Sequence, residues 1–88
     1  MKQWCVYILR CRDGTLYTGA TDDLQRRFAA HMCGKGAKYT RGRLPLEIVY
    51  SETCADRSAA LRREAAIKHL SRTEKTRLIC GQEALPHA

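Results

Sequence analysis

The sequence lacks three features that would each direct it to a different class of protein. It has no run of apolar residues approaching the roughly 18 needed for a membrane span, and its first residues lack the apolar stretch of a signal peptide. Its five cysteines are widely spaced and include no Cys-x-x-Cys pair, which argues against a disulfide framework and a zinc site. We therefore expect a cytoplasmic protein whose cysteines are reduced and mostly buried.

Acidic residues are also scarce, because nine of them stand against sixteen basic residues and leave a net charge of +7. A basic balance of this size favours a polyanionic partner, either nucleic acid or an anionic membrane surface. The 88 residues are enough for one domain with a modest core. We therefore expect a shallow surface cleft rather than a large enclosed cavity.

Two short strands that each carry a tyrosine are the most informative local feature. They flank Arg12-Asp13-Gly14, which fits a three-residue hairpin loop with its glycine in the left-handed conformation. In that register Tyr7 faces Gly19, and Tyr7 and Tyr17 lie on the same face of the sheet. A two-residue loop would place the phenols on opposite faces, and tyrosine is in any case common in strands. The three-residue register predicts a site where two phenols converge beside a glycine.

The whole pattern predicts an α+β domain. The expected elements are strands 4–11 and 15–19, a helix from Asp22 to about Cys33, a strand over 46–54, a helix over about 56–70 and a short helix from Ser71 that ends before Gly81. This order, ββαβαα, indicates a three-stranded, largely antiparallel sheet flanked by helices. Asp22 with Gln25, and Ser71 with Glu74, form the expected capping boxes. Residues 34–45 should be irregular, and we expect one domain over 1–81 with a loose tail over 82–88.

Glu64 is a candidate metal ligand. On its expected helix it falls about 60° from both Leu61 and Ile67, within the stripe that should face the core. A carboxylate there is costly unless it is compensated, and Mg²⁺ is commonly held by one carboxylate together with water and substrate phosphate. An i,i+4 pair with Lys68, or a salt bridge to an arginine elsewhere, would compensate the charge as well.

Arg27 and His31 are spaced i,i+4 on the first expected helix. They flank a stripe that should bury Phe28 and Met32, so both can look along the edge of the sheet. The planar guanidinium of an arginine suits a phosphate, because it donates two parallel hydrogen bonds. The alternatives are that Arg27 is only solvated and that His31 is only a favourable charge near a helix end.

The loop over residues 34–45 carries four positive charges and no negative one. Its candidate nucleic-acid-binding residues are Lys35, Lys38, Tyr39, Arg41 and Arg43. The cations can follow a phosphate backbone, and the tyrosine offers a face on which an unpaired base can stack. Flexible basic loops are common, so this feature alone has low specificity.

Several segments together resemble the GIY-YIG endonuclease superfamily, and in particular its small stand-alone bacterial branch. They are Val6-Tyr7-Ile8, Tyr17-Thr18-Gly19, Asp23 to His31, Lys38-Tyr39-Thr40-Arg41, Leu44-Pro45-Leu46, Val49-Tyr50 and Ala60 to Glu64. The resemblance covers nearly the whole chain from Trp4 to about Ile79. Each tripeptide alone is weak, whereas the ordered set of two tyrosine strands, a helical arginine and a later glutamate is specific.

The resemblance implies a role for each site residue. Tyr7 and Tyr17 would flank the scissile phosphate, and one of them would help to activate the attacking water. Arg27 would stabilise the charge that develops on the phosphoryl oxygens, and Glu64 would hold one Mg²⁺ or Mn²⁺ ion. His31 would be auxiliary. Some family members have an asparagine after the metal-binding glutamate, but this chain contains no asparagine, so that role is absent or filled otherwise.

The resemblance implies a divalent-metal-dependent endonuclease that hydrolyses DNA phosphodiester bonds with low sequence specificity. Its expected partner is DNA, in single-stranded or irregular form, with RNA as an alternative substrate and no membrane partner. Repair, recombination and the processing of incoming DNA are all open as biological roles. The main alternative is a nucleic-acid-binding module of the same fold that does not cleave. A structural protein whose charge serves only solubility is a third reading, and it would leave Glu64 unexplained.

Overall fold

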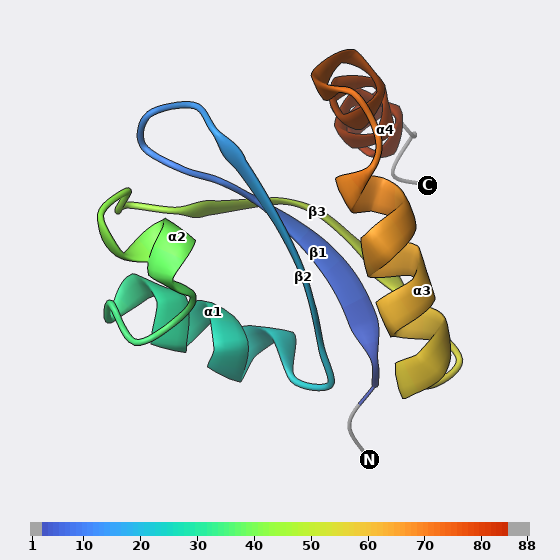
Figure 1. The fold of residues 1–88 in the computed structure, drawn as a ribbon, viewed down its shortest axis with the longest axis horizontal. Helices are drawn as coiled ribbons and strands as arrows, with labels where there is room; N and C mark the ends of the chain where they lie inside the picture. The colour runs from blue at the N-terminus through green and yellow to red at the C-terminus, as the bar shows by residue number, and fades with distance from the viewer. Residues whose placement is uncertain (1–2, 85–88) are drawn as a thin grey trace.

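The computed structural model describes residues 3–84, and these form a sheet with helices on both of its faces. The elements are β1 (Cys5–Arg10), β2 (Leu16–Thr21), α1 (Leu24–Met32), α2 (Lys38–Arg41), β3 (Glu47–Thr53), α3 (Arg57–Lys68) and α4 (Arg72–Ala84). The antiparallel sheet has the order β2-β1-β3. Figure 1 shows α1 and α2 to one side of the strands and α3 and α4 to the other. The expected α+β architecture is confirmed.

The hairpin between β1 and β2 has the predicted three-residue loop. Tyr7 pairs with Gly19 and Leu9 with Tyr17, and the Cys11 amide donates to the Thr15 carbonyl over 2.8 Å. Gly14 has a φ of 85°, a left-handed conformation that favours glycine. Both tyrosines therefore lie on one face of the sheet, as predicted.

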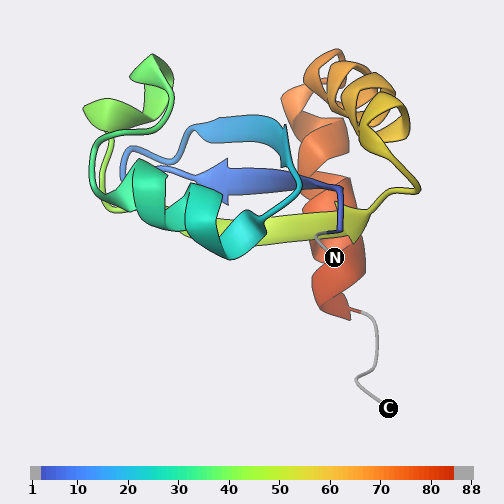
Figure 2. The ribbon, with the colours of Figure 1, turned by 90° about the horizontal axis from the view of Figure 1, so that it is seen from below.

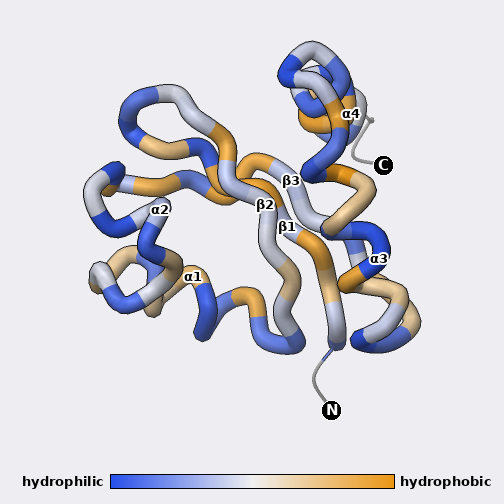
Figure 3. Tube along the Cα trace, in the orientation of Figure 1, coloured by the Kyte–Doolittle hydropathy of each residue, from blue (hydrophilic) through white to orange (hydrophobic). Residues whose placement is uncertain are grey.

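Strand β1 is the centre of the molecule, because it is covered on both faces. Val6 and Ile8 are fully buried against α3 and α4, while Tyr7 and Leu9 are buried on the face that α1 covers. Figure 2 shows the strands between the two helical layers, and Figure 3 shows hydrophobic residues along the strands and hydrophilic ones at the β1–β2 turn. The result is two small apolar clusters that share one strand.

The first helix begins one residue later than predicted. Asp23, not Asp22, is its N-cap, and the Asp23 carboxylate accepts a hydrogen bond from the Arg26 amide over 3.1 Å. The Thr21 hydroxyl accepts a hydrogen bond from the Asp23 amide over 3.1 Å and so closes a turn before the helix. That turn holds Asp23 at the capping position, and the predicted Asp22–Gln25 capping box is therefore wrong.

The region predicted to be irregular contains the short helix α2. Its N-cap, Ala37, has extended backbone angles, and the Thr40 hydroxyl donates to the Ala37 carbonyl over 2.9 Å. The Arg43 amide donates to the Thr40 carbonyl over 3.1 Å as the chain leaves the helix. Thr40 is fully buried, so contacts with the rest of the fold stabilise a turn that local composition does not favour.

The last two helices begin as expected but differ in other respects. Asp56 caps α3, and the predicted Ser71–Glu74 capping box is present, with amide-to-side-chain distances of 3.0 and 3.1 Å. Helix α4 does not stop before Gly81 but continues to Ala84. Residues 82–84 of the expected loose tail are therefore helical, while residues 85–88 lie outside the described part of the chain.

The cysteines are unpaired, as predicted, but they are not mostly buried. Only Cys5 and Cys11 are buried, while Cys33 and Cys80 are exposed and Cys54 is intermediate. Within residues 3–84, no three histidine, cysteine, aspartate or glutamate side chains gather as a potential metal cluster. No helix in this same range is long and apolar enough to cross a membrane.

Candidate active site

The candidate site lies at β2, an edge strand of the sheet, where the phenol of Tyr7 packs against Gly19. A Cβ atom added to Gly19 would lie 2.5 Å from the Tyr7 hydroxyl oxygen, closer than real Cβ contacts allow. The glycine is therefore required so that the tyrosine of the central strand can reach the edge strand. The rings of Tyr7 and Tyr17 lie 6.5 Å apart, which confirms the predicted convergence of the two phenols.

A chain of hydrogen bonds runs inward from the Tyr7 hydroxyl. That hydroxyl lies 3.0 Å from Nε2 of His31, and Nδ1 of His31 lies 2.9 Å from Oγ1 of Thr40. Because Thr40 donates its single hydroxyl hydrogen to the Ala37 carbonyl, its oxygen must accept the hydrogen on His31 Nδ1. A neutral His31 then has a free lone pair on Nε2, and Tyr7 donates to it.

Thr40 and Gly36 are site residues that the sequence reasoning missed. His31 is fully buried, and a Cβ atom on Gly36 would lie 2.2 Å from its Nδ1 and 2.8 Å from its Cα. Gly36 thus lets the loop close over the histidine, while Thr40 fixes the ring orientation. The only sequence signal was the Lys38-Tyr39-Thr40-Arg41 segment, in which the threonine had received no role.

The electrostatic setting keeps both members of the Tyr7–His31 pair neutral at rest. The pKa of Tyr7 is raised to about 12, chiefly by burial and to a smaller extent by the charges of Tyr17 and Glu64. A hydrogen bond from Arg27 and the charge of that guanidinium act in the opposite direction. Burial, followed by the positive charge of Arg27, lowers the pKa of His31 below its usual value. The imidazole is therefore a neutral acceptor at pH 7.

Glu64 approaches the same site from α3. Its carboxylate influences the pKa of Tyr7, and its side chain is only 19% exposed. It forms the i,i+4 ion pair with Lys68 that the sequence offered as an alternative, at 3.1 Å. Leu61, expected to face the core, is 42% exposed, so the buried face of α3 is centred on Ala60 and Ile67 and Glu64 lies at its border.

Tyr17 differs from Tyr7 in its surroundings. Within residues 3–84 its hydroxyl makes no hydrogen bond, whereas its ring is in contact with three others. Its ring centre lies 5.4 Å from that of His31 and 6.0 Å from that of Tyr39, with which it is stacked. Among the described residues, Tyr17 therefore makes ring contacts alone, whereas the Tyr7 hydroxyl has a proton acceptor in His31.

Comparison with known proteins agrees with this geometry. A family model described as the GIY-YIG catalytic domain matches residues 3–77. The chain belongs to the GIY-YIG family. It is 54% identical over 81 residues to a UPF0213 protein of Desulfotalea psychrophila, and this match covers 91% of this chain and 74% of that one. It is 53% identical over 77 residues to a UPF0213 protein of Natronomonas pharaonis, covering 88% and 91% of the two chains.

Two solved structures share the GIY-YIG fold of this chain. The solution NMR structure of the UPF0213 protein from Bacillus halodurans is 48% identical and covers 91% of this chain and 84% of that one, with a TM-score of 0.57. The solution NMR structure of a protein from E. faecalis is 36% identical and covers 100% and 94%, with a TM-score of 0.66. Both agree with the architecture described above.

The expected nucleic-acid-binding residues of this GIY-YIG domain surround α2. Lys35, Lys38 and Arg41 are exposed. Arg43 is instead engaged in the fold, because it forms an ion pair with Asp13 at 3.1 Å and its guanidinium lies 4.1 Å above the centre of the Tyr39 ring. A base that stacks on that face of Tyr39 must therefore displace Arg43 or stack on the guanidinium itself.

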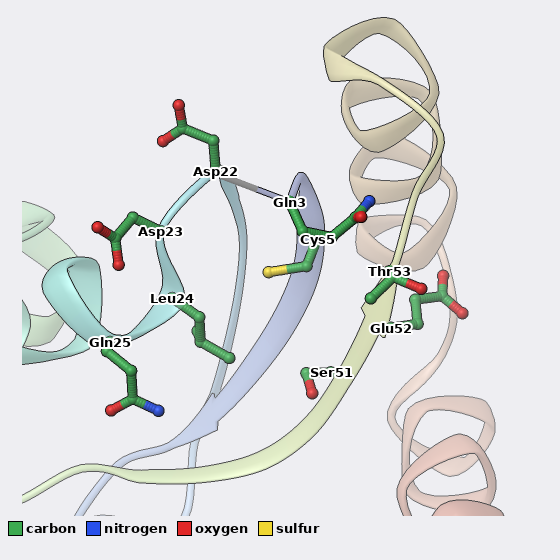
Figure 4. Close-up of a pocket in the computed structure, with 9 residues that line it drawn as sticks. All are labelled: Gln3, Cys5, Asp22, Asp23, Leu24, Gln25, Ser51, Glu52 and Thr53. Atoms are coloured by element: carbon green, nitrogen blue, oxygen red, sulfur yellow. The ribbon is translucent and has the colours of Figure 1, made fainter. Parts of the chain in front are cut away.

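A hollow of about 460 Å³ opens at the start of α1 and β1, and Figure 4 shows the side chains around it. Two of them, Asp22 and Asp23, are acidic, and a third acidic residue, Glu52, forms an ion pair with Arg63. None of the candidate catalytic residues of the GIY-YIG domain lines it. Its acidic lining would repel a phosphate backbone, so we assign it no part in the chemistry at β2.

Proposed function

We propose that the protein is a divalent-metal-dependent endonuclease that hydrolyses phosphodiester bonds of DNA with low sequence specificity. The observation that carries the proposal is the convergence of Tyr7, Arg27, His31 and Glu64 at the Gly19 edge of the sheet. Hydrolysis needs a base for water, positive charge beside the phosphoryl oxygens and help for the leaving oxygen. The residues at β2 offer each of these functions.

Tyr7 is the proposed proton acceptor for the attacking water. Its own proton points at His31 Nε2, so the tyrosine can release that proton inward while its oxygen takes one from water. A phenol whose pKa is about 12 is a poor base by itself, and the neutral imidazole makes the paired transfer possible. As the water oxygen bonds to phosphorus, the bond from phosphorus to the leaving oxygen breaks.

Arg27 is the proposed stabiliser of the transition state. Its guanidinium lies close enough to the Tyr7 hydroxyl to lower the pKa of that phenol, so it is beside the position that we propose for the scissile phosphate. Fixed positive charge in that position opposes the negative charge that develops on the phosphoryl oxygens. It also favours the phenolate form of Tyr7 during proton transfer.

Glu64 is the proposed ligand of Mg²⁺ or Mn²⁺. The described residues contain no three-ligand cluster, but Mg²⁺ needs only one or two carboxylates when water and substrate phosphate complete its shell. The partly exposed carboxylate of Glu64 beside Tyr7 fits that arrangement, and its ion pair with Lys68 can be exchanged for the cation. A bound cation supplies charge neutralisation at the phosphate and the leaving oxygen.

The expected substrate is single-stranded or irregular DNA. The exposed cations near α2 can follow a phosphate backbone without reading base edges. Phosphate contacts dominate affinity and make it strongly dependent on salt.

The test is a cleavage assay with labelled single-stranded, duplex and branched DNA and with single-stranded RNA, in Mg²⁺, Mn²⁺ or EDTA. We expect metal-dependent cutting by the native protein, none by Glu64→Gln, and DNA binding by Glu64→Gln that is unchanged or slightly tighter. Glu47→Gln is the matched control, because that exposed carboxylate pairs with Arg10 at the far end of β3. Binding of DNA by the native protein without cutting under any condition would instead indicate a non-catalytic module.

A further inference from the structure

A second recessed surface adjoins the proposed active site at the beginning of β2. It is a cleft of about 200 Å³ lined by Thr15 and Leu16 of the hairpin, Tyr39 of α2, and Arg72 and Lys75 of α4. Tyr39 connects it to the catalytic centre, because its ring stacks on that of Tyr17. Neither Arg72 nor Lys75 belongs to the site predicted from the sequence.

Lys75 carries a positive charge that the fold does not compensate. It lies one turn before the buried Ile79, so it is on the inward side of α4 and is only partly exposed. None of the carboxylates placed in residues 3–84 forms an ion pair with its ammonium. A partly desolvated cation is costly without a counter-charge, and an anion in the cleft would supply one.

Arg72 adds a second cation in a fixed position. It donates a hydrogen bond to the Gly14 carbonyl over 2.8 Å, which ties the start of α4 to the tip of the hairpin. Its remaining guanidinium hydrogens are available to the cleft. Two cations, an aromatic edge and an apolar floor from Leu16 are the combination that suits a phosphate joined to a sugar and base.

The cleft also lies in the direction that a bound strand would take. Among the described strands, β2 pairs with β1 and has no partner at its other edge, and the candidate catalytic residues lie near its middle. Thr15, just before β2, and Thr21, at the end of β2, are about 20 Å apart at the usual rise of an extended strand. A hollow next to Thr21 is lined by Arg26 and Arg27 but also by Asp22 and Asp23, so its charges are mixed, whereas the cleft at Thr15 has basic residues and no acidic one in its lining.

We propose that the Lys75 cleft, defined by Thr15, Leu16, Tyr39, Arg72 and Lys75, is a nucleotide subsite that holds a phosphate next to the scissile one. It takes an unpaired nucleotide of a single strand that runs along β2, with Lys75 and Arg72 at its phosphate. This inference rests on the proposed nuclease function and adds to it the direction of the strand and a contact from α4.

The test compares two variants of one helix. Lys75→Met keeps the aliphatic stem and removes the charge, while Arg77→Met makes the same change in charge on nearly the opposite side of α4. Affinity for fluorescent oligothymidylates is measured by anisotropy at several salt concentrations, in the Glu64→Gln background so that nothing is cut. Lys75→Arg is the conservative variant, and thermal unfolding checks that each variant folds.

We expect Lys75→Met to weaken binding by about three- to tenfold and to reduce the salt slope by about one, as for one lost phosphate contact. Arg77→Met should change affinity less than about twofold, and Lys75→Arg should retain it. A substrate with one neutral methylphosphonate beside the mapped cut site should bind more weakly than the unmodified substrate to the Glu64→Gln protein that retains Lys75. The same substrate should show little further loss with Lys75→Met, because the two changes remove one interaction.

Equal effects of Lys75→Met and Arg77→Met would overturn the subsite while leaving the nuclease in place, provided that the protein binds and cuts DNA. Full additivity of the methylphosphonate and Lys75→Met at every position near the cut would also overturn it. Absence of any binding or cutting of nucleic acid by the native protein would instead overturn the proposed function, and the subsite with it.

Discussion

The two sides of the proposed active site are built to different degrees of completeness. On the α1 side, Tyr7, His31 and Thr40 are almost fully buried and joined by hydrogen bonds of 2.9 and 3.0 Å. On the α3 side, Glu64 is partly exposed and has one ion pair, with a lysine that is itself 53% exposed. In the proposed mechanism, the side that handles the proton is thus assembled before substrate arrives, while the side that would hold the metal offers a partly exposed carboxylate.

This difference matches what each side has to do. Proton transfer requires donors and acceptors aligned to within a few tenths of an ångström, so a rigid, buried chain is favourable. A site for Mg²⁺ gains from open coordination positions, because the ion keeps several waters and shares the substrate phosphate. Exchange of Lys68 for the cation would keep a positive charge beside a carboxylate that is only 19% exposed.

Arg27 lies beside the Tyr7–His31 pair, and its loss should have one of the largest effects of the changes considered below. Arg27→Ala should cost about 2–4 kcal/mol of transition-state stabilisation, or roughly 30- to 1,000-fold in kcat/KM. Single-turnover cleavage with the enzyme in excess over the substrate would measure this loss. Arg26→Ala is the control, because that exposed neighbour carries the same charge and should change the rate little. A loss below tenfold for Arg27→Ala would count against the role.

Gly19 tests whether the buried side must be preassembled. Gly19→Ala places a Cβ atom 2.5 Å from the Tyr7 hydroxyl, so the phenol must move and its bond to His31 must distort. We expect at least about a tenfold loss of cleavage, with a stability cost of about 1–3 kcal/mol from overpacking. Gly42→Ala, where no atom lies within 4 Å of the added Cβ, should change neither quantity appreciably.

Burial of a neutral His31 should give the smallest effect, a dependence of stability on pH. The pKa of His31 is lowered on folding, so the unfolded chain binds more protons as pH falls below about 6.5. The free energy of unfolding should therefore decrease between pH 7.5 and 5.5. Urea denaturation of the native protein and of His31→Gln would measure the difference, and the variant should show the flatter profile. A native profile that is equally flat would contradict a neutral buried histidine.

Sequence reasoning predicted the part of the site that depends on strand pairing. A three-residue loop with Gly14 in the left-handed conformation sets the register, and the register alone places Tyr7 opposite Gly19. The helical position of Arg27 was predicted for a similar reason, because a helix that packs on a sheet presents residues i and i+4 together. Local rules therefore sufficed to bring the two tyrosines together, whereas they left a solvated Arg27 and a merely terminal His31 as alternatives, and the roles of both came from the family resemblance.

The remaining contacts depend on tertiary packing that no local pattern encodes. Thr40 and Gly36 lie in a segment rich in glycine. The short helix α2 in that segment is accounted for by its contacts with His31, which packs against Gly36 and bonds Thr40. The rotation of α3 was also misjudged, because Leu61 proved exposed.

The rotation of α3 follows from its packing on β2 and β1, which buries Ala60 and Ile67. Arg63 pairs with Glu52, which also accepts a hydrogen bond from Tyr50 over 2.7 Å. This pair is an additional contact at one side of the helix. Glu64 lies between Ala60 and Ile67 in the chain, so the packing that buries those two side chains also turns Glu64 toward β2.

The most direct test of the account compares single-turnover cleavage by Tyr7→Phe and Tyr17→Phe. Both changes remove one hydroxyl and keep the ring, but only Tyr7 donates to His31. The account predicts a loss of at least about 100-fold for Tyr7→Phe, as for a missing general base, and a loss at least ten times smaller for Tyr17→Phe. A larger loss for Tyr17→Phe, or equal losses for both, would contradict the proposal that the buried Tyr7–His31 pair handles the proton of the attacking water.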